Sequence, residues 1–265
     1  MQGVFDGQPD RVERELGRGA IVVSANRLTV FGSSYDNHYL PPEVIEQFRR
    51  SAPGKAARKY LDGRWMAPEN LVYYEFDFGR HIVADVGDRG RHVHIGLDIG
   101  DQSAVVFAQE RKIDCKSRGL TAHETGLLVV DELTPVQVGT EEVCRQIRDR
   151  GWIVHPERST ICVAPTIRRE EIAAIRNVFP TISIIRKTRK GHADATEPGH
   201  TAVNRALRDA DDNVRLVFSR LLERGDGSLI RSMLGFRRRP GGLPIRDDRL
   251  DHKADALRYV VHHHL

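Results

Sequence analysis

Carboxylates at the ends of apolar segments are the side chains of this sequence best suited to chemistry. Asp98 lies in the apolar run IGLDIG, and Asp131 and Glu132 end the run LLVVDEL. Burying a carboxylate is unfavourable unless it is hydrogen-bonded, ion-paired or bound to a metal. Asp98 is therefore either a hydrogen-bonded structural residue at a strand end or a metal ligand. For Asp131 and Glu132 the simpler alternative is a strand that reaches solvent, with one side chain on each face of the sheet.

A third acidic group lies at the start of the last apolar segment. Asp251, His252 and Asp255 share one face of a helix, and Asp247 and Asp248 precede them. Acids at this position also complement a helix dipole, which is the simpler explanation. Carboxylates at strand ends and on a helix nevertheless match the oxygen ligands of Mg²⁺. Two such ions can bind the attacking and the leaving oxygen of an in-line phosphoryl displacement.

Basic residues are concentrated in one stretch of the chain. The sequence has 41 Lys and Arg against 37 Asp and Glu, a net charge of +4. Residues 145–190 alone hold eleven Lys and Arg against four Asp and Glu, a net charge of +7. A local positive field suits a polyanion, although a solvated basic face would look the same. A nuclease needs acidic residues to bind a metal and basic residues to bind the phosphate backbone. The presence of both favours a nuclease over a small-molecule enzyme.

Several other classes of protein are disfavoured. The sequence has no GxxxxGK[ST], GxSxG or HExxH motif, and Cys115, Cys144 and Cys162 form no CxxC pair. The lone histidines lack ligand spacing. The run His262–His264 could bind a metal adventitiously, but a frayed helix end is the favoured interpretation. No apolar run approaches the about 18 residues that span a membrane, and the first residues do not resemble a signal peptide. We therefore expect a soluble protein of a reducing compartment.

The apolar pattern predicts an α/β fold with a mixed sheet flanked by helices. The chain has 265 residues, of which 40% are hydrophobic and 29% charged, enough for one large domain or a medium domain with an extension. A short helix is expected after Pro41, and Thr140 and Gly151 are expected to cap and end a later helix. The expected strands cover 92–100, 103–111, 126–133, 159–165, 181–187 and 214–218, and the expected helices cover 140–151, 166–179, 197–210, 227–234 and 251–261.

These segments, in their order, resemble the C-terminal nuclease half of the large terminase subunit of tailed bacteriophages. The resemblance covers nearly the whole chain. It implies a ribonuclease H-like nuclease domain at 91–265, after a remnant of the motor's end and a linker or docking segment at 1–90. SSYDNHYLPPEVIEQFRR and KYLDGRWMAPENLVYYEFD look like the stretch joining the packaging ATPase to the nuclease. IGLDIGDQSAVVFAQ looks like the first hairpin, LLVVDEL like the third strand, and GSLIRSMLGFRRR with LDHKADALRYVV like the terminal segment.

The resemblance also implies roles for individual residues. Asp98 matches the metal-binding aspartate of the first strand, and Asp251 with His252 matches the pair at the start of the last helix. The sequence departs from the pattern at Ala164, where many relatives have a metal-binding aspartate before proline. Glu132, or Asp131 beside it, is expected to compensate. The implied catalytic residues are Asp98, Glu132, Asp251 and His252, and the implied metal ligands are Asp98, Asp131, Asp251 and Asp255.

The implied activity is that of an Mg²⁺- or Mn²⁺-dependent endodeoxyribonuclease. It would hydrolyse phosphodiester bonds of concatemeric DNA during viral genome packaging in the host-cell cytoplasm. The implied partners are double-stranded DNA, a separate terminase ATPase chain, the small terminase subunit and the portal. Because this sequence lacks the usual P-loop motor, residues 1–85 are expected to dock the separate motor chain. The expected DNA-backbone contacts are Arg168, Arg169, Arg186, Lys187, Arg189 and Lys190, with Arg237–Arg239 as a further candidate.

Two other functions stay open at this point. The first is a catalytically weakened DNA-binding or docking subunit, in which the loss of the aspartate at position 164 has disabled the metal centre. The second is another ribonuclease H-like nuclease, such as a junction resolvase, which would cleave branched DNA selectively. Stabilisation by Mg²⁺ or Mn²⁺ that disappears in Asp98→Asn distinguishes an intact centre from a disabled one.

Overall fold

The structure is a computed structural model that describes most of the chain. It describes residues 21–24, 27–30, 33–52, 54, 57, 60–61, 70–100, 102–117, 120–186, 196–223, 228–239, 244 and 251–265. Among these, no helix is long and apolar enough to cross a membrane.

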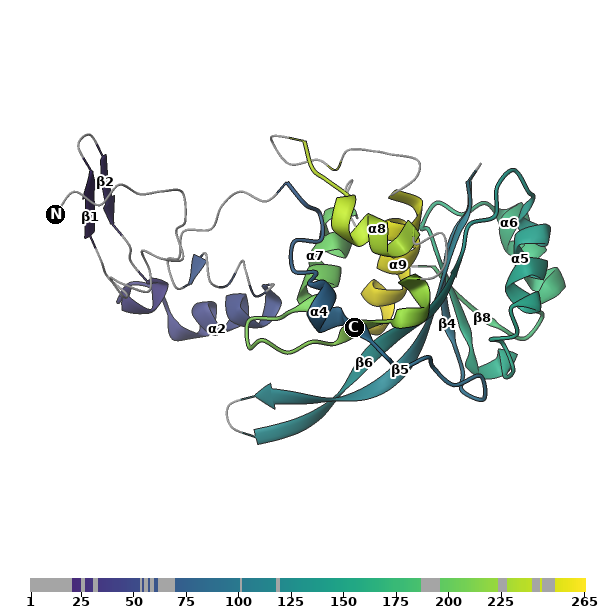
Figure 1. The fold of residues 1–265 in the computed structure, drawn as a ribbon, viewed down its shortest axis with the longest axis horizontal. Helices are drawn as coiled ribbons and strands as arrows, with labels where there is room; N and C mark the ends of the chain where they lie inside the picture. Colours follow the sequence, from purple (N-terminus) through teal and green to yellow (C-terminus); the bar gives the residue numbers. More distant parts are fainter. Residues whose placement is uncertain are drawn as a thin grey trace.

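A seven-stranded mixed sheet forms the centre of the molecule (Figure 1). Three strands, β4 (His94–Asp98), β5 (Ala104–Ser117) and β6 (Leu120–Leu133), form an antiparallel meander. On the other side of β4, β7 (Thr160–Val163) and β8 (Ser183–Arg186) run parallel to it. Beyond β6 lie β9 (Leu216–Ser219) and β3 (Ile82–Val83), so the order is β3-β9-β6-β5-β4-β7-β8.

This arrangement is ribonuclease H-like. A meander of three strands is followed by two parallel strands that are added on the far side of the first one. The crossover connections carry α5 (Thr140–Asp149) and α6 (Arg169–Val178). The predicted α/β fold with a mixed sheet between helices is therefore confirmed.

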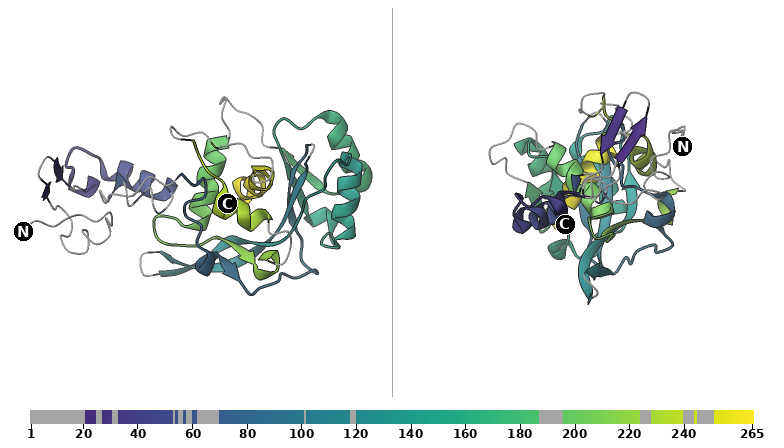
Figure 2. Two further views of the ribbon diagram at one scale, coloured as in Figure 1. Left: turned by 45° about the horizontal axis from the view of Figure 1, so that its top comes forward. Right: turned by 90° about the vertical axis from the view of Figure 1, so that its left-hand side faces the viewer.

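Two apolar cores lie on the two faces of the sheet, because successive side chains of a strand point to opposite faces. One core joins the sheet to α5 and α6 and includes Ile95 and Leu97 of β4. The other joins it to α7 (Thr196–Leu207), α8 (Ser228–Gly235) and α9 (Asp251–His264). Figures 1 and 2 show the two groups of helices on opposite sides of the sheet. Alternation along β4 therefore turns positions 94, 96 and 98 toward α9.

The closest approach between α9 and the sheet occurs at Gly96. A Cβ atom at this position would lie 1.9 Å from the carbonyl oxygen of Ala256 and 2.9 Å from a methyl group of Val260. Real Cβ atoms do not approach a backbone oxygen so closely, so only glycine lets the helix backbone rest on β4. The contact fixes α9 along the strand that carries Asp98.

An irregularity between β5 and β6 sets the direction of the acids at the end of β6. Phe107 is opposite Asp131 but its neighbour Ala108 is opposite Val129, so Val130 is the extra residue of a β-bulge. Beyond the bulge the alternation is reversed. Glu132, opposite Val106, faces α8 and α9, whereas Asp131 faces the side of α5.

The N-terminal part contacts the far end of α7. It contains the hairpin of β1 (Ile21–Ser24) and β2 (Arg27–Val30), followed by α2 (Pro42–Ser51). Figure 1 shows these elements at one end of the molecule, away from α5 and α6. Arg49 pairs with Asp211, and the amide of Gly54 donates to the carbonyl of Arg208 at 2.9 Å.

The strong sequence patterns place the elements within a few residues of their observed ends. The helix after Pro41 is observed, but α5 is capped by Gly139 rather than by Thr140, without a side-chain cap. β5 and β6 extend beyond their predicted spans, and α9 continues to His264. The short β3, β1 and β2, and the single turn α4 (Phe78–His81), have no matching prediction.

The close contact at Gly96 gives a direct test of this packing. Gly96→Ala is expected to lower the free energy of unfolding by about 3 kcal/mol or more, because its methyl group overlaps the backbone of α9 and no rotamer relieves the overlap. Gly139→Ala is the matched control. A Cβ atom at Gly139 has no heavy atom within 4 Å, so its loss of stability should stay below about 1 kcal/mol. Urea denaturation measures both, and equal losses would contradict the packing.

Candidate metal centre

Asp98 lies at the end of β4, on the face of the sheet that α9 covers. Its side chain is 14% exposed. The Nδ1 of His252 donates a hydrogen bond to Oδ2 of Asp98 at 2.8 Å, and the hydroxyl of Tyr259 donates to Oδ1 at 3.3 Å. Asp98 is therefore hydrogen-bonded, as its burial requires, and both donors come from α9.

The first turns of α9 add negative charge to this site. Asp251 is the first residue of the helix, and Asp255 lies one turn further on. Burial raises the pKa of Asp255. Arg258, which donates to Oδ1 of Asp255 at 2.8 Å and 3.0 Å, opposes this shift, whereas the charges of Asp98 and Asp251 add to it. The pKa of Asp255 is raised overall, first by its burial, and the charges of Asp98 and Asp251 contribute to the shift.

A cavity opens beside Asp98, at the carboxyl ends of two parallel strands. It has a volume of about 460 Å³ and lies between β4, β7, α5 and α6. Leu97 pairs with Val163 across β4 and β7, so Asp98 and Ala164 are the next residues of neighbouring strands. Both line the cavity, together with Tyr259, Thr140 and Glu171. Ala164 therefore occupies the place where a second carboxylate would face Asp98.

Glu132 lies on the same face of the sheet as Asp98, but it already has partners. Its Oε2 accepts from the backbone amide of Leu229 at 3.0 Å and forms an ion pair with Lys253 of α9. The side chains of Glu132 and Lys253 are only 6% and 2% exposed. The pair compensates two buried charges, and Oε2 is already engaged before any ion binds.

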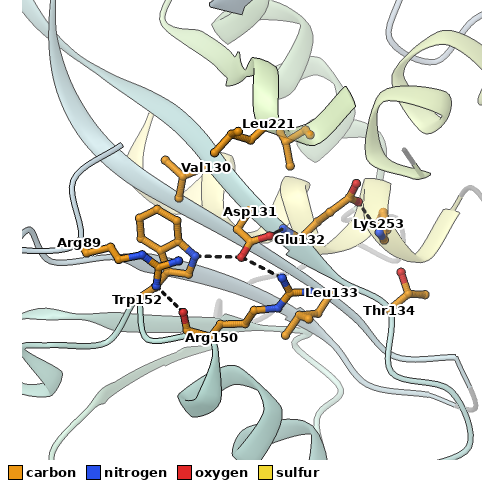
Figure 3. A pocket seen from close by; sticks show the side chains of 11 residues that line it. Arg89, Val130, Asp131, Glu132, Leu133, Thr134, Arg150, Trp152, Leu221 and Lys253 are labelled. Carbon is orange, nitrogen blue, oxygen red and sulfur yellow. Dashed lines mark hydrogen bonds and ion pairs between the residues drawn. The ribbon is translucent and has the colours of Figure 1, made fainter. Parts of the chain in front are cut away.

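Asp131 lies in a second cavity, of about 510 Å³, on the side of α5 (Figure 3). The indole nitrogen of Trp152 donates to its Oδ2 at 2.9 Å, and Arg150 lies 3.6 Å from the same oxygen. The guanidinium of Arg89 lies over the Trp152 ring, 4.5 Å from the ring centroid. Glu132 and Lys253 also line this cavity, so both acids at the end of β6 border it, although their positions in the strand place them on opposite faces of the sheet, as predicted.

The structure therefore groups some of the predicted residues and separates others. Asp98, His252 and Asp255 meet through α9, and Asp251 acts on the same group by its charge. Glu132 belongs to an ion pair with Lys253, and Asp131 to a separate group with Trp152. Tyr259 and Lys253 were missed. The spacing of Tyr259, seven residues after His252, could have placed its hydroxyl on the same helix face. Nothing local in the sequence indicates the partner of Lys253.

The predicted DNA contacts have different surroundings. Arg168 lines the cavity beside Asp98, but its guanidinium is held by Glu171 at 2.7 Å and 3.0 Å. Arg169 is exposed at the start of α6, and Arg186 is exposed at the end of β8. Lys187, Arg189 and Lys190 lie outside the described residues, as do Asp247 and Asp248.

The ion pair of Glu132 can be tested separately from any metal. With EDTA present, Glu132→Gln is expected to lower the free energy of unfolding by about 3–5 kcal/mol, because the buried ammonium of Lys253 loses its carboxylate partner. The double variant with Lys253→Met should recover most of that loss. Glu142→Gln, which breaks an exposed pair with Arg145, should cost less than about 1 kcal/mol. Additive losses in the double variant would show that the two side chains do not act as a pair.

Comparison with known proteins extends the description of the fold. No protein-family model matches the chain, and no curated protein matches it. Among solved structures, the large terminase of thermophilic bacteriophage D6E matches with a TM-score of 0.57 and 19% identity, over 88% of this chain and 54% of that chain. Its complex with ATP-gamma-S matches with a TM-score of 0.58 and 18% identity, over 87% and 54%.

The large terminase nuclease of thermophilic phage G20c matches more weakly. Its TM-score is 0.48 with 10% identity, over 74% of this chain and 100% of that chain. The present chain spans about half the length of the D6E large terminase that it matches. Its structural neighbours are thus phage large terminase chains, and over the part that it covers the chain has the ribonuclease H-like fold of a phage large terminase.

Proposed function

We propose that this chain is a divalent-metal-dependent DNA endonuclease of a phage packaging terminase. The observation that carries the proposal is the position of Asp98. It is a partly buried carboxylate at the end of β4, joined by the acidic first turns of α9 and facing a cavity. The D6E large terminase, whose fold the chain shares, gives the proposal its biological setting.

The donor set fits Mg²⁺ or Mn²⁺ by its chemistry. Asp98, Asp251 and Asp255 offer carboxylate oxygens, the ligands that these hard cations prefer. Burial raises the pKa of Asp255, and the charges of Asp98 and Asp251 add to the shift; a cation beside these carboxylates would interact favourably with them. Among the described residues, no three acids of this group place donor atoms within 4.8 Å of one another. Binding would therefore require their side chains to turn toward a common point.

A bound divalent ion would stabilise the charge that develops at a phosphodiester during hydrolysis and would help to ionise a water molecule. The chain's own residues position this chemistry. His252 and Tyr259 hold the two oxygens of Asp98 from the side of α9, which fixes the orientation of the carboxylate. The cavity beside Asp98 provides the room that a backbone phosphate needs.

The surroundings of the cavity suit a phosphate backbone. The N-termini of α5 and α6 both border it, through Thr140 and Arg168. Helix N-termini present backbone amides that favour anions. Contacts of this kind position DNA without reading its sequence, so we propose cleavage of concatemeric double-stranded DNA with little base specificity. Arg169, Arg186 and the basic residues after β8 would extend the contact along the strand.

The remaining partners follow from the same proposal. The chain would act in the host-cell cytoplasm with a separate terminase ATPase chain, the small terminase subunit and the portal. Residues 1–85 would dock the ATPase. A second candidate function is a DNA-binding or docking subunit with weakened catalysis. It is favoured by Ala164, which places a methyl group where a second carboxylate would face Asp98.

Cleavage of supercoiled plasmid separates these two functions. The purified chain is expected to nick plasmid with Mn²⁺ or Mg²⁺ and not with EDTA. Asp98→Asn should lower the rate at least about a hundredfold, because the ion loses its ligand and with it several kcal/mol of transition-state stabilisation. Asp149→Asn, at a position 73% exposed on α5, is the matched control and should keep the rate. Plasmid binding without cutting under all metal conditions would favour the weakened subunit.

Restoring a carboxylate at position 164 tests the geometry of the centre. Ala164→Asp is expected to tighten Mn²⁺ binding at least about tenfold, because a second carboxylate would face Asp98 across the ends of β4 and β7. Ala173→Asp adds the same charge on the exposed face of α6 and should leave the affinity unchanged. Isothermal titration calorimetry at constant ionic strength measures both. Equal affinities in the two variants would show that position 164 does not face the ion.

A further inference from the structure

A group of histidines lies at the opposite end of β4 from Asp98. His94 begins β4, and His92 lies two residues before it, so both side chains point to the α9 face of the sheet. His94 is opposite Ala108 in the antiparallel pair of β4 and β5. Because the strands run in opposite directions, Glu110, two residues after Ala108, is opposite His92, two residues before His94. The last turn of α9 brings His264 to the same place, where its ring centroid is 3.7 Å from that of His94.

The donor atoms of this group converge. His92, His94 and Glu110 each place one nitrogen or oxygen so that all three lie within 4.8 Å of one another. Nε2 of His94 is 3.3 Å from Oε1 of Glu110, and Nε2 of His92 is 3.9 Å from Oε2. Two ligands of a tetrahedral zinc ion are about 3.3 Å apart, given bonds of about 2.0–2.1 Å. Small side-chain rotations would therefore place all three atoms around one ion.

The surroundings of His94 have the features of a metal ligand. Its side chain is 5% exposed, and its other ring nitrogen, Nδ1, lies 2.8 Å from the hydroxyl of Thr160 on β7. A histidine that binds a metal through one nitrogen commonly has the other held in this way, which fixes the ring orientation. Among the described residues, the buried Nε2 of His94 has no hydrogen-bond partner. A bound cation would satisfy it.

The charge state of the ligands also agrees. Burial, together with the neighbouring His92 and His263, lowers the pKa of His94 to about 4. Burial and neighbouring histidines likewise lower the pKa of His264 to about 3. Neutral imidazole is the form that binds metals, and the site itself rests on the convergence of its donor atoms. Nδ1 of His264 lies 3.9 Å from Oε1 of Glu110, within reach of a fourth position.

We propose that His92, His94 and Glu110 form a binding site for a zinc-like transition-metal ion, with His264 beside the fourth position. Imidazole and carboxylate donors select Zn²⁺, Co²⁺ or Ni²⁺ over Mg²⁺, which prefers oxygen ligands alone. The site is therefore distinct in chemistry from the carboxylate centre at Asp98. His94 lies four positions before Asp98 in β4, about 13 Å along the strand.

The site has a structural consequence. Its ligands come from the strand pair β4–β5, and His264 comes from the end of α9. If His264 also bound the ion, the end of α9 would be fixed to β4 and β5. The first turns of α9 already contact this part of the sheet at Asp98. The proposal differs from the expectation from sequence that the histidines lack ligand spacing. The His-x-His alternation along β4 is the signal, and its partners lie on other elements.

The test uses the full chain, stripped with EDTA and titrated with Co²⁺ at pH 7.5. Tetrahedral Co²⁺ absorbs visible light strongly, whereas octahedral Co²⁺ does so weakly, so the spectrum identifies the site as well as the affinity. The wild-type chain is expected to bind one tetrahedral Co²⁺ ion, which one equivalent of Zn²⁺ displaces and excess Mg²⁺ does not. His92→Gln and Glu110→Gln, at positions 38% and 43% exposed, should each weaken binding at least about tenfold.

Two control variants separate this site from other sources of the signal. His155→Gln removes an exposed histidine that pairs with Glu157 and should bind Co²⁺ like the wild type. Asp98→Asn should also keep the tetrahedral spectrum, because it alters only the carboxylate centre. The proposal is overturned if the wild-type chain shows no saturable tetrahedral spectrum. It is also overturned if His92→Gln and Glu110→Gln bind with wild-type affinity, or if Asp98→Asn abolishes the spectrum.

Discussion

The approach of α9 to β4 at Gly96 is the contact on which the rest of the structure depends. The carbonyl of Ala256 occupies the space that a side chain at position 96 would need. The helix therefore packs directly on the strand at this point. Its first turns bring His252 and Asp255 to the partly buried carboxylate of Asp98. The same contact brings His264, at the other end of the helix, to His94. One missing side chain thus positions the groups at both ends of β4.

The second constraint is electrostatic. Acids at strand ends are stable in this interior only because each has a partner of a defined kind. Asp131 accepts from the indole of Trp152, and Glu132 pairs with Lys253 from α9. Strand alternation places the two acids on opposite faces, and the bulge at Val130 decides which face each one takes. Asp98, Asp251 and Asp255 are different, since three carboxylates gather at one site, where burial and the charges of Asp98 and Asp251 raise the pKa of Asp255. This difference identifies the acids most suited to a cation.

The elements were predictable from the sequence because apolar runs and helical periodicity are local properties. The run IGLDIG is β4, and DHKADALRYVV lies within α9. The placement of Asp98 in a buried strand follows from the same pattern. The resemblance to terminase sequences pointed to the same fold, which the topology confirms. Short elements such as β3 have no such pattern, because two residues are too few to show a period.

The unpredicted features are long-range. Lys253 pairs with Glu132 across 121 residues, and His264 meets His94 only because α9 packs along β4. The direction of Asp131 and Glu132 depends on a single extra residue in β6, which sequence alternation alone cannot place. The spacing of His92 and His94 was visible in the sequence. Its significance appears only when Glu110 is placed opposite them by the pairing of β4 with β5.

The central claim is that Asp98 and the acidic start of α9 together bind a divalent cation. Anomalous diffraction from crystals of the full chain grown with Mn²⁺ tests it most directly, because the signal locates manganese without reference to activity. The account predicts an anomalous peak within bonding distance of Asp98 and of Asp251 or Asp255, on the cavity side of β4. A well-ordered structure with no peak at Asp98, at a manganese concentration that supports binding in solution, would contradict it.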